Sequence, residues 1–294
     1  MQSLYDICAP AKLNLFLHIT GRRADGYHLL QSVFMLIDWC DTLHFDVRAD
    51  GQISREDLGW ALPADDLVLR AARALQRSTL CPLGAHIGVA KSIPAQAGMG
   101  GGSSDAASTL LALNRLWNLN LSLEALTAIG LSLGADVPFF LGGHNAWVEG
   151  IGEKITPLEL PHGRFVVVKP DVGLETQRIF SDPELKRDSK TAIISGFAAD
   201  GFDKYKFGRN DLQAVAQKLC PGVTDALGWL QSQGLSGRMT GSGSAVFAHV
   251  LHDVNDLDCV KSAPDALQVR LCSNMDVHPL VGWATSDGLS VGSV

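Results

Sequence analysis

The sequence predicts a protein of mixed α and β structure, because its apolar residues recur with two different periods. Residues 6–20 and 31–45 have the apolar pattern of β-strands, and residues 164–169 form a shorter run of the same kind. After a cluster of glycines, apolar side chains recur over residues 106–113 at the spacing of a helix face. No internal repeat or low-complexity segment accompanies these patterns, so we expect a mixed α and β protein that is not a repeat array.

The first predicted strand, residues 6–20, contains one conspicuous charge. Its sequence is D-I-C-A-P-A-K-L-N-L-F-L-H-I-T, and Lys12 shares a strand face with Asn14 because side chains alternate between the two faces. A lone lysine on a strand is most often solvated, so Lys12 by itself does not indicate function. The second predicted strand, residues 31–45, includes Phe34.

The segment that joins these two strands, residues 20–28, is predicted to turn. Asp25-Gly26 is a common turn signal. By itself it indicates the end of a hairpin that exposes the rings of Tyr27 and His28.

A helix is predicted over residues 63–77. Asp65 or Asp66 is the expected N-cap, and apolar residues at positions 68, 71, 72 and 75 give the helix one buried face. Residues 86–89 are predicted to form a strand that leads to Lys91. By its position alone, Lys91 is almost equally well explained as a surface lysine at the end of a strand.

A glycine cluster precedes the helix expected over residues 106–113. Four glycines stand within five residues, at positions 98, 100, 101 and 102, and Ser103 or Ser104 is the expected N-cap. Such a junction leaves backbone N–H groups unpaired at the positive end of the helix dipole, which suits a phosphate group. Glycine also lets an anion approach the amides and permits positive φ angles.

The glycine cluster alone does not establish a phosphate site. No lysine follows the glycines, so the pattern G-x-x-x-x-G-K-[ST] does not match. The run that starts at Gly98 ends in Ser103, so the dinucleotide pattern G-x-G-x-x-G does not match either. An ordinary glycine turn that opens a helix therefore stays an alternative on these residues.

A second helix is predicted over residues 121–133, with Ser122 as its N-cap. The motif G-A-D-V-P-F-F-L-G follows at residues 134–142. Its Asp136 has apolar neighbours and precedes Pro138, which cannot continue a helix from its interior. Taken alone, an aspartate in this position most often caps a helix.

The best domain boundary lies at residues 157–161 and divides the chain into residues 1–157 and 158–294. Beyond it we expect a strand, a loop or helix start, a loop-rich stretch, two helices, and a glycine turn that runs into an apolar strand. These cover residues 164–169, 175–180, 182–206, 212–218, 223–233 and 237–248. The tail after His278 is expected to be partly disordered.

Composition argues against several classes of protein. The 294 residues carry a net charge of −7 without a run of Lys and Arg, so nucleic acid is not an expected partner. The six cysteines are scattered without a C-x-x-C motif, and we expect reduced, mostly buried thiols. There is no apolar signal segment and no stretch of ~20 apolar residues, so we expect no membrane association and a cytoplasmic location. The oligomeric state is left open.

Five segments, in order along the chain from Ala9 to Phe247, together resemble the motifs of the GHMP kinases. This family is named after galactokinase and the homoserine, mevalonate and phosphomevalonate kinases. The segments are P-A-K-L-N-L, R-R-A-D-G-Y-H, P-A-Q-A-G-M-G-G-G-S-S, G-A-D-V-P-F-F and G-R-M-T-G-S-G-S-A-V-F. The resemblance implies an α+β fold with a two-domain GHMP kinase architecture. Its N-terminal domain is like one domain of a ribosomal protein, and its C-terminal domain is ferredoxin-like. ATP is the implied phosphate donor, with Mg²⁺ on its phosphates.

The resemblance places the phosphates of ATP on the glycine loop and the start of the helix that follows. This chain has Gln96 where many relatives have glycine, and Met99 where they have leucine; neither change removes a backbone amide. Ligands for Mg²⁺ are not assigned. The residues implied at ATP are Lys91, Pro94, Ala95, Gln96, Ala97, Gly98, Met99, Gly100, Gly101, Gly102, Ser103 and Ser104.

The resemblance also implies catalytic roles for Lys12 and Asp136. Asp136 would be the general base for the acceptor hydroxyl, and Lys12 would keep it ionised and stabilise charge on the reacting oxygens. The strings D-G-Y-H and K-L-N-L-F-L are most similar to family members that act in non-mevalonate isoprenoid synthesis. Those kinases phosphorylate the C2 hydroxyl of a cytidine diphosphate derivative of methylerythritol, a small-molecule acceptor.

In those family members the tyrosine and histidine belong to a cytosine pocket, which implies that Phe180 lies opposite the Tyr27 ring. A tyrosine ring suits stacking on a base, and the adjacent histidine offers hydrogen bonds to the edge of a pyrimidine. The implied acceptor-binding residues are Asn14, Tyr27, His28, Phe34, Thr176, Phe180 and Gly241.

Two alternatives stay open. The first is a kinase of this family that phosphorylates another small alcohol, such as mevalonate or homoserine. The three aromatic residues Tyr27, His28 and Phe180 disfavour it, because neither alcohol needs an aromatic clamp. The second is a non-catalytic module that binds a nucleotide or RNA. The net negative charge and the presence of both Lys12 and Asp136 disfavour that alternative.

Overall fold

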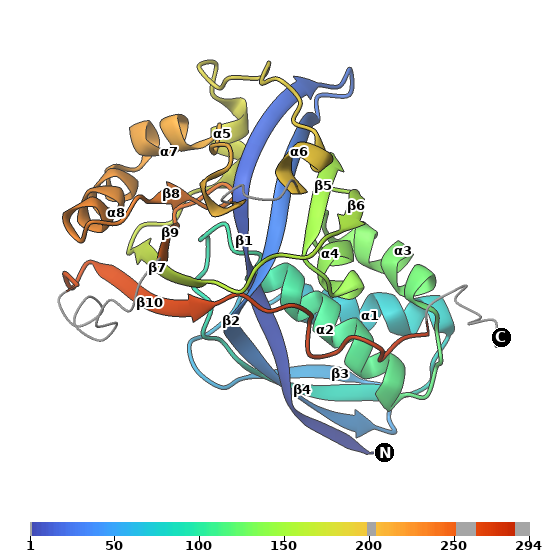
Figure 1. Cartoon of the computed structure of the whole chain (residues 1–294). Coiled ribbons are helices and arrows are strands. Elements are labelled where there is room, and N and C mark those ends of the chain that lie inside the picture. The colour runs from blue at the N-terminus through green and yellow to red at the C-terminus, as the bar shows by residue number, and fades with distance from the viewer. Residues whose placement is uncertain (1, 199–203, 251–262, 286–294) are drawn as a thin grey trace.

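The computed structural model describes residues 2–198, 204–250 and 263–285. Two β-sheets, each covered by helices, make up the molecule, and the prediction of an α+β fold is confirmed. In Figure 1 the long pair of strands β1 and β2 runs through the middle, with helices α1 to α4 on one side and strands β7 to β10 with helices α7 and α8 on the other. Among the described residues, no helix has the length and apolar character that crossing a membrane requires.

The first sheet has six strands and is built around the long hairpin of β1 and β2. Its strand order is β3-β4-β2-β5-β6, with β1 also paired to β2, and only the β3–β4 pair is parallel. Helix α1 connects the parallel strands, as a crossover between parallel strands requires. The strands are β1 (Ser3–Arg22), β2 (His28–Arg48), β3 (Ile53–Asp57), β4 (Gly84–Ala90), β5 (Ala146–Gly150) and β6 (Lys154–Pro157).

Helices α1 (Leu67–Thr79), α2 (Gly101–Leu116), α3 (Leu123–Leu133) and α4 (Val137–Gly142) pack on this sheet. Asp66 caps α1 by accepting a hydrogen bond from the Leu69 backbone N–H at 3.0 Å, and Ser122 caps α3 in the same way, as predicted. Most of α2 is buried because it lies between the sheet and the other helices, rather than presenting one apolar face.

The second sheet has the order β10-β7-β9-β8 and is antiparallel throughout. Its strands are β7 (Arg164–Pro170), β8 (Arg238–Met239), β9 (Val246–Val250) and β10 (Leu267–Ser273). Helices α5 (Thr176–Ser181), α7 (Gln213–Leu219) and α8 (Pro221–Ser232) accompany it. Helix α6 (Ile194–Ala198) lies against the first sheet, where Phe197 contacts Phe16 of β1 and Trp147 of β5.

The middle of β1 lies between the two halves of the molecule. Leu13 and Leu15 are fully buried in a core that also contains Phe165 of β7 and Phe247 of β9. A break in the β1–β2 register between Asn14 and Leu17 interrupts the regular pairing at this point. Such bulges redirect side chains and are common beside active sites.

The chain returns to the first half after β10. Isolated bridges join Ile37 to Asn274 and His144 to Val277, and Leu280 is buried in the core of the first sheet. The last residues described therefore pack on the N-terminal half, as the final segment of the trace shows in Figure 1. The division at residues 157 and 158 stays a prediction, and the tail beyond residue 285 lies outside the described residues, as does Cys259.

Candidate active site

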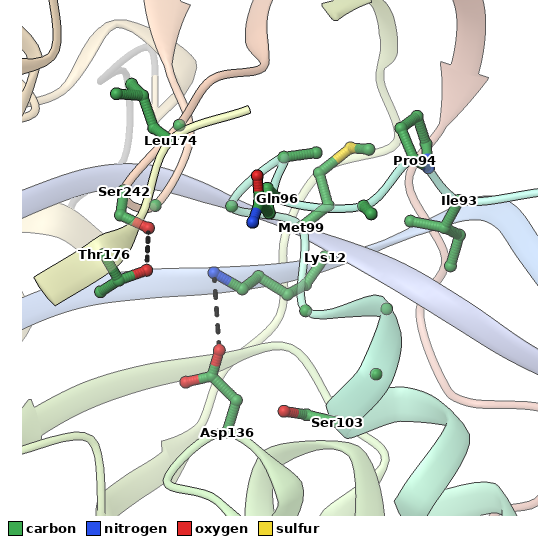
Figure 2. A pocket seen from close by; sticks show the side chains of 18 of the residues that line it. Lys12, Ile93, Pro94, Gln96, Met99, Ser103, Asp136, Leu174, Thr176 and Ser242 are labelled. Carbon is green, nitrogen blue, oxygen red and sulfur yellow. Dashed lines mark hydrogen bonds and ion pairs between the residues drawn. The ribbon is translucent and has the colours of Figure 1, made fainter. Parts of the chain in front are cut away.

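A cavity of about 970 Å³ opens between the two halves of the molecule. Its walls come from β1, the segment from Lys91 to the start of α2, the start of α4, helix α5 and the turn before β9. Figure 2 shows side chains from all of these segments around one space. Four of the five resembling segments therefore contribute directly to this cavity.

The glycine loop forms one wall, and α2 begins earlier than predicted. Gly100 is the N-cap in the left-handed conformation, with φ of 73°, and the helix starts at Gly101. The expectation that Ser103 or Ser104 caps this helix is wrong. Glycine adopts a positive φ without strain, so the chain turns into the helix before the serines are reached.

This early start leaves backbone N–H groups of the first turn facing the cavity. Gly100 has no side chain with which to cap them, and Gly101, Gly102 and Ser103 all line the cavity. Ser104 does not: it is fully buried, and its N–H donates to the Gly100 carbonyl at 2.9 Å. The exposed N–H groups lie at the positive end of a 16-residue helix, which is favourable for an anion.

The loop is attached to both halves of the molecule through its backbone. The Met99 carbonyl accepts a hydrogen bond from Lys12 N–H at 3.0 Å, and the Gln96 carbonyl accepts one from Ser244 N–H at 3.1 Å. At Gly98, which has φ of 72°, a Cβ atom would overlap the Thr240 carbonyl oxygen. The loop conformation is thus set by close contact with the turn before β9.

Gln96 occupies a position where glycine is the natural choice. Its φ is 51°, and side chains rarely adopt this region without strain. The Gln96 side chain lies so close to Gly173 that a Cβ atom there would overlap it. The departure from the family pattern is therefore accommodated by a glycine on a neighbouring loop.

Behind the glycine loop lies a buried cluster of one lysine and two aspartates. Lys91 forms ion pairs with Asp41 of β2 and with Asp105 of α2, the latter at 2.5 Å. Asp41 is fully buried and also accepts hydrogen bonds from the Ser92 and Ile93 N–H groups at 2.6 and 2.8 Å. The cluster ties the strand that enters the loop to the helix that leaves it.

The ion cluster explains how a carboxylate is tolerated beside the loop that the resemblance assigns to phosphate. Asp105 is directed to the Lys91 ammonium, which offsets its negative charge. Burial raises the pKa of Asp105 to about 7, although Lys91 opposes this shift and Asp41 adds to it. Lys91 lines the cavity, but its ammonium is already engaged by two carboxylates.

Lys12 and Asp136 meet beside the glycine loop. Lys12 Nζ lies 3.8 Å from Asp136 Oδ2, donates to Asn14 Oδ1, and sits 4.7 Å from the centre of the Phe34 ring. Burial lowers the pKa of Lys12, while the Asp136 carboxylate opposes that change. Asp136 is the N-cap residue of α4, but its side chain accepts no capping bond and is directed toward Lys12 (Figure 2).

The remaining predicted acceptor residues are only partly brought together. Asn14, Phe34, Thr176, Phe180 and Gly241 line the cavity, and the Thr176 hydroxyl lies 2.7 Å from that of Ser242. Tyr27 and His28 lie outside the lining. The Tyr27 residue is 60% exposed, and the ring next to Phe180 is that of His28, at 5.0 Å between centroids. The structure thus places His28 against Phe180, and the expectation that Phe180 lies opposite the Tyr27 ring stays a prediction.

Sequence analysis missed several residues that shape the site. Asp41 and Ser32 lie in an apolar strand pattern that gives no functional signal, although a charge buried on a strand is itself unusual. Ser32 accepts a hydrogen bond from Asn14 Nδ2 at 2.8 Å, and Thr240 accepts one from the Asn14 backbone. Leu62, Pro63, Leu67 and Val68 add an apolar wall beyond the glycine loop.

Family comparison agrees with the motif resemblance. A family model described as the GHMP kinases N terminal domain matches residues 66–144, and one described as the GHMP kinases C terminal matches residues 199–268.

Related proteins match along the whole chain. This chain is 76% identical over 293 residues to a protein of Albidiferax ferrireducens named 4-diphosphocytidyl-2-C-methyl-D-erythritol kinase, with 100% of both chains covered. A protein of the same name from Variovorax paradoxus is 65% identical over 297 residues, which cover 97% of this chain and 100% of that protein.

Solved structures of the same architecture include a crystal structure of 4-(cytidine 5'-diphospho)-2C-methyl-D-erythritol kinase. It is 31% identical, has a TM-score of 0.77, and is matched over 91% of this chain and 98% of that chain. The homoserine kinase of Cytophaga hutchinsonii shares the fold alone, at 14% identity and a TM-score of 0.68, over 95% of this chain and 96% of that chain.

Proposed function

The chain belongs to the GHMP kinases and is a small-molecule kinase, and on this premise we propose which alcohol it phosphorylates. The acceptor is 4-diphosphocytidyl-2-C-methyl-D-erythritol, and the γ-phosphoryl group of ATP is transferred to its C2 hydroxyl. The products are the 2-phosphate and ADP. The named relatives that match the full chain support this choice. As the motif resemblance implies, we assign the reaction to isoprenoid precursor synthesis. We propose the cytoplasm as its location.

The observation that carries the proposal is the placement of Lys12 and Asp136 beside a glycine loop in one cavity. ATP phosphates on the first turn of α2 would lie next to this pair. An acceptor hydroxyl between them would meet a carboxylate on one side and a phosphoryl group on the other.

In the proposed reaction, Asp136 accepts the proton of the C2 hydroxyl as that oxygen forms its bond to the γ-phosphorus. The bond between the γ-phosphorus and the bridging oxygen breaks, and ADP leaves with that electron pair. Lys12 keeps Asp136 ionised and offsets the negative charge on the reacting oxygens. Most of the rate enhancement comes from this positioning and charge stabilisation.

Two groups of residues serve the two substrates in this proposal. The segment from Pro94 to Ser103 binds ATP through its backbone, and the buried Lys91 supports that segment. Around the acceptor, Asn14 orients Lys12, while Phe34, Thr176 and Gly241 line the space for the sugar alcohol. In this proposal, Phe180, His28 and Tyr27 enclose the cytosine base at the outer end of the acceptor site.

We include Mg²⁺ in the proposal, because phosphoryl transfer uses a divalent ion to neutralise charge on the phosphates. Among the described residues there is no cluster of three or more His, Cys, Asp or Glu side chains that could hold a metal. Asp105 is engaged by Lys91, and Ser104 is buried. The described side chains thus offer no ready-made cage for Mg²⁺, and the ion would be held largely by phosphate oxygens of ATP.

An assay of ADP release with three acceptors tests the proposal. We expect turnover with the cytidyl acceptor and none with mevalonate or homoserine at equal concentrations. Turnover with mevalonate or homoserine alone would move the chain to another branch of the family. ADP release that no acceptor stimulates would contradict the kinase assignment itself.

A further inference from the structure

Arg187 lies outside every resembling segment, yet its guanidinium joins three parts of the acceptor side. Its two terminal nitrogens donate to the carbonyls of Leu185, Phe180 and Asp182 at 2.9, 3.1 and 2.8 Å. Its Nε donates to Nε2 of His28 at 3.0 Å. One side chain therefore holds the end of α5, the loop after it, and the first residue of β2.

The contact with Arg187 determines where His28 carries its hydrogen. An arginine side chain has only donors, so Nε2 of His28 must accept and cannot be protonated. The neutral ring then carries its hydrogen on Nδ1. Burial lowers the pKa of His28, and the positive charges of Arg187 and of Arg22 on the paired strand β1 lower it further, so the ring stays neutral. These two arginines are the charged groups that act on the ring.

We propose that Arg187 is a positioning residue that holds His28 as the neutral Nδ1–H tautomer, ready to donate a hydrogen bond to a carbonyl oxygen of the acceptor's pyrimidine. This inference rests on the proposed function. The His28 ring packs against Phe180, which lines the cavity, and Arg187 holds the backbone of Phe180 as well. The same guanidinium thus sets the chemistry of His28 and the spacing of the two rings.

Without Arg187, either nitrogen of the neutral ring can carry the hydrogen. A ring protonated on Nε2 would present the Nδ1 lone pair to a carbonyl oxygen, and both groups are acceptors. At a pH below the ordinary histidine pKa of ~6.5, the ring would carry hydrogens on both nitrogens and the donor would return. Loss of Arg187 should therefore make acceptor binding depend on pH with recovery in acid.

The first measurement is the tautomer of His28 in the ligand-free enzyme, by nitrogen NMR of histidine-labelled protein. The His28→Asn variant assigns its signals among the nine histidines. We expect the Nδ1–H form in the wild type and a shift toward Nε2–H in Arg187→Met. A ring that stays Nδ1–H in Arg187→Met would overturn the proposal, whatever the substrate.

The second measurement is calorimetric affinity for 4-diphosphocytidyl-2-C-methyl-D-erythritol at pH 8 and at pH 5.5. In Arg187→Met we expect affinity to fall about tenfold at pH 8, the usual cost of a mispaired hydrogen-bonding group, and to recover in part at pH 5.5. The wild type should change little between these two pH values. An equal loss at both pH values would indicate a purely structural role and would contradict the proposal.

Two further variants separate folding from positioning. Lys186→Met removes a charge from an exposed neighbour in the same loop and should leave both measurements unchanged. Arg187→Lys cannot hold all three carbonyls. Because lysine still offers a donor to His28, the variant should retain the Nδ1–H form of that ring. An unchanged KM for ATP in each variant shows that the fold is intact. If the wild type does not bind the cytidyl acceptor, the proposed function fails, while the NMR result still decides the role of Arg187.

Discussion

The two ends of the cavity are built in different ways. The glycine-loop end consists of contiguous backbone, held by hydrogen bonds to β1 and to the turn before β9 and supported by the buried cluster of Lys91, Asp41 and Asp105. The end proposed for the acceptor is lined by side chains from separate segments, among them Asn14 and Thr176, and the exposed Tyr27 lies outside that lining. Rigid backbone suits a phosphate group, whereas the side chains that line an acceptor site can differ between family members that use different acceptors.

This difference explains why one family can phosphorylate many alcohols. Backbone N–H groups at a helix start do not depend on side-chain identity, so the phosphate end is compatible with many acceptor pockets. A site that recognises a base needs specific rings and donors, and these must be supplied by individual residues. We therefore expect substitutions at the two ends to affect different kinetic constants.

The largest effect is expected where the two ends meet. Asp136→Asn keeps the shape of the side chain and removes its basicity, so kcat should fall by roughly 10²–10⁴ while both substrates still bind. Lys12→Met should impair the same step, and the double variant should lose less than the product of the two single losses. Single-turnover quench measurements with both substrates saturating test this. Wild-type chemistry in Asp136→Asn would rule out the general-base role.

The next largest effect is expected at the glycine-loop end. Gly98→Ala places a side chain where φ is 72° and against the Thr240 carbonyl. The left-handed conformation alone costs about 1–2 kcal/mol, so the KM for ATP should rise about tenfold or more. The KM for the acceptor should change much less. Gly228→Ala on α8, which meets no atom within 4 Å, is the matched control and should be neutral. Normal use of ATP by Gly98→Ala would show that the loop conformation is not required.

An effect of comparable size, but confined to the acceptor, is expected from the aromatic walls. Tyr27→Ala and Phe180→Ala should each weaken binding of the cytidyl acceptor by ~1–3 kcal/mol, the range of a base stacked on an aromatic ring, with ATP affinity unchanged. Calorimetry with each ligand separates the two affinities. Tyr27 is largely exposed, so its loss should leave Tm unchanged, whereas Phe180 also packs on the core beneath α5. Equal losses for both ligands would identify these rings as packing residues only.

The smallest effect is a pH dependence of stability at the glycine-loop end. Because the folded-state pKa of Asp105 is raised to about 7, its contribution to stability is greatest below the unfolded pKa of ~3.9 and is lost as pH rises toward 7. Asparagine does not ionise, so Asp105→Asn removes this decrease in stability with rising pH. The free energy of unfolding of the variant, relative to wild type, should therefore rise between pH 5 and pH 7, by at most ~1.4 kcal/mol per pH unit. A difference that does not vary with pH over this range would show that Asp105 stays ionised.

Sequence alone determined the features that depend on neighbouring residues. The helix caps at Asp66 and Ser122 and the strand that carries Lys12 follow from local chemistry, because each involves contacts within a few residues. The glycine loop is predictable for the same reason. Its exact helix start was not, because glycines and serines both serve as caps. At Gly100 the positive φ and the close approach of Phe140 and Lys12 are set by the tertiary structure.

Tertiary structure alone decided which side chains meet. Lys91 finds its partners 50 residues before it and 14 residues after it, and Arg187 reaches back to the first residue of β2. The pairing of Phe180 with His28 likewise depends on how α5 is held against the β1–β2 hairpin. Such contacts carry no local periodicity, since they arise only when distant segments are buried together and each charge or donor must find a partner.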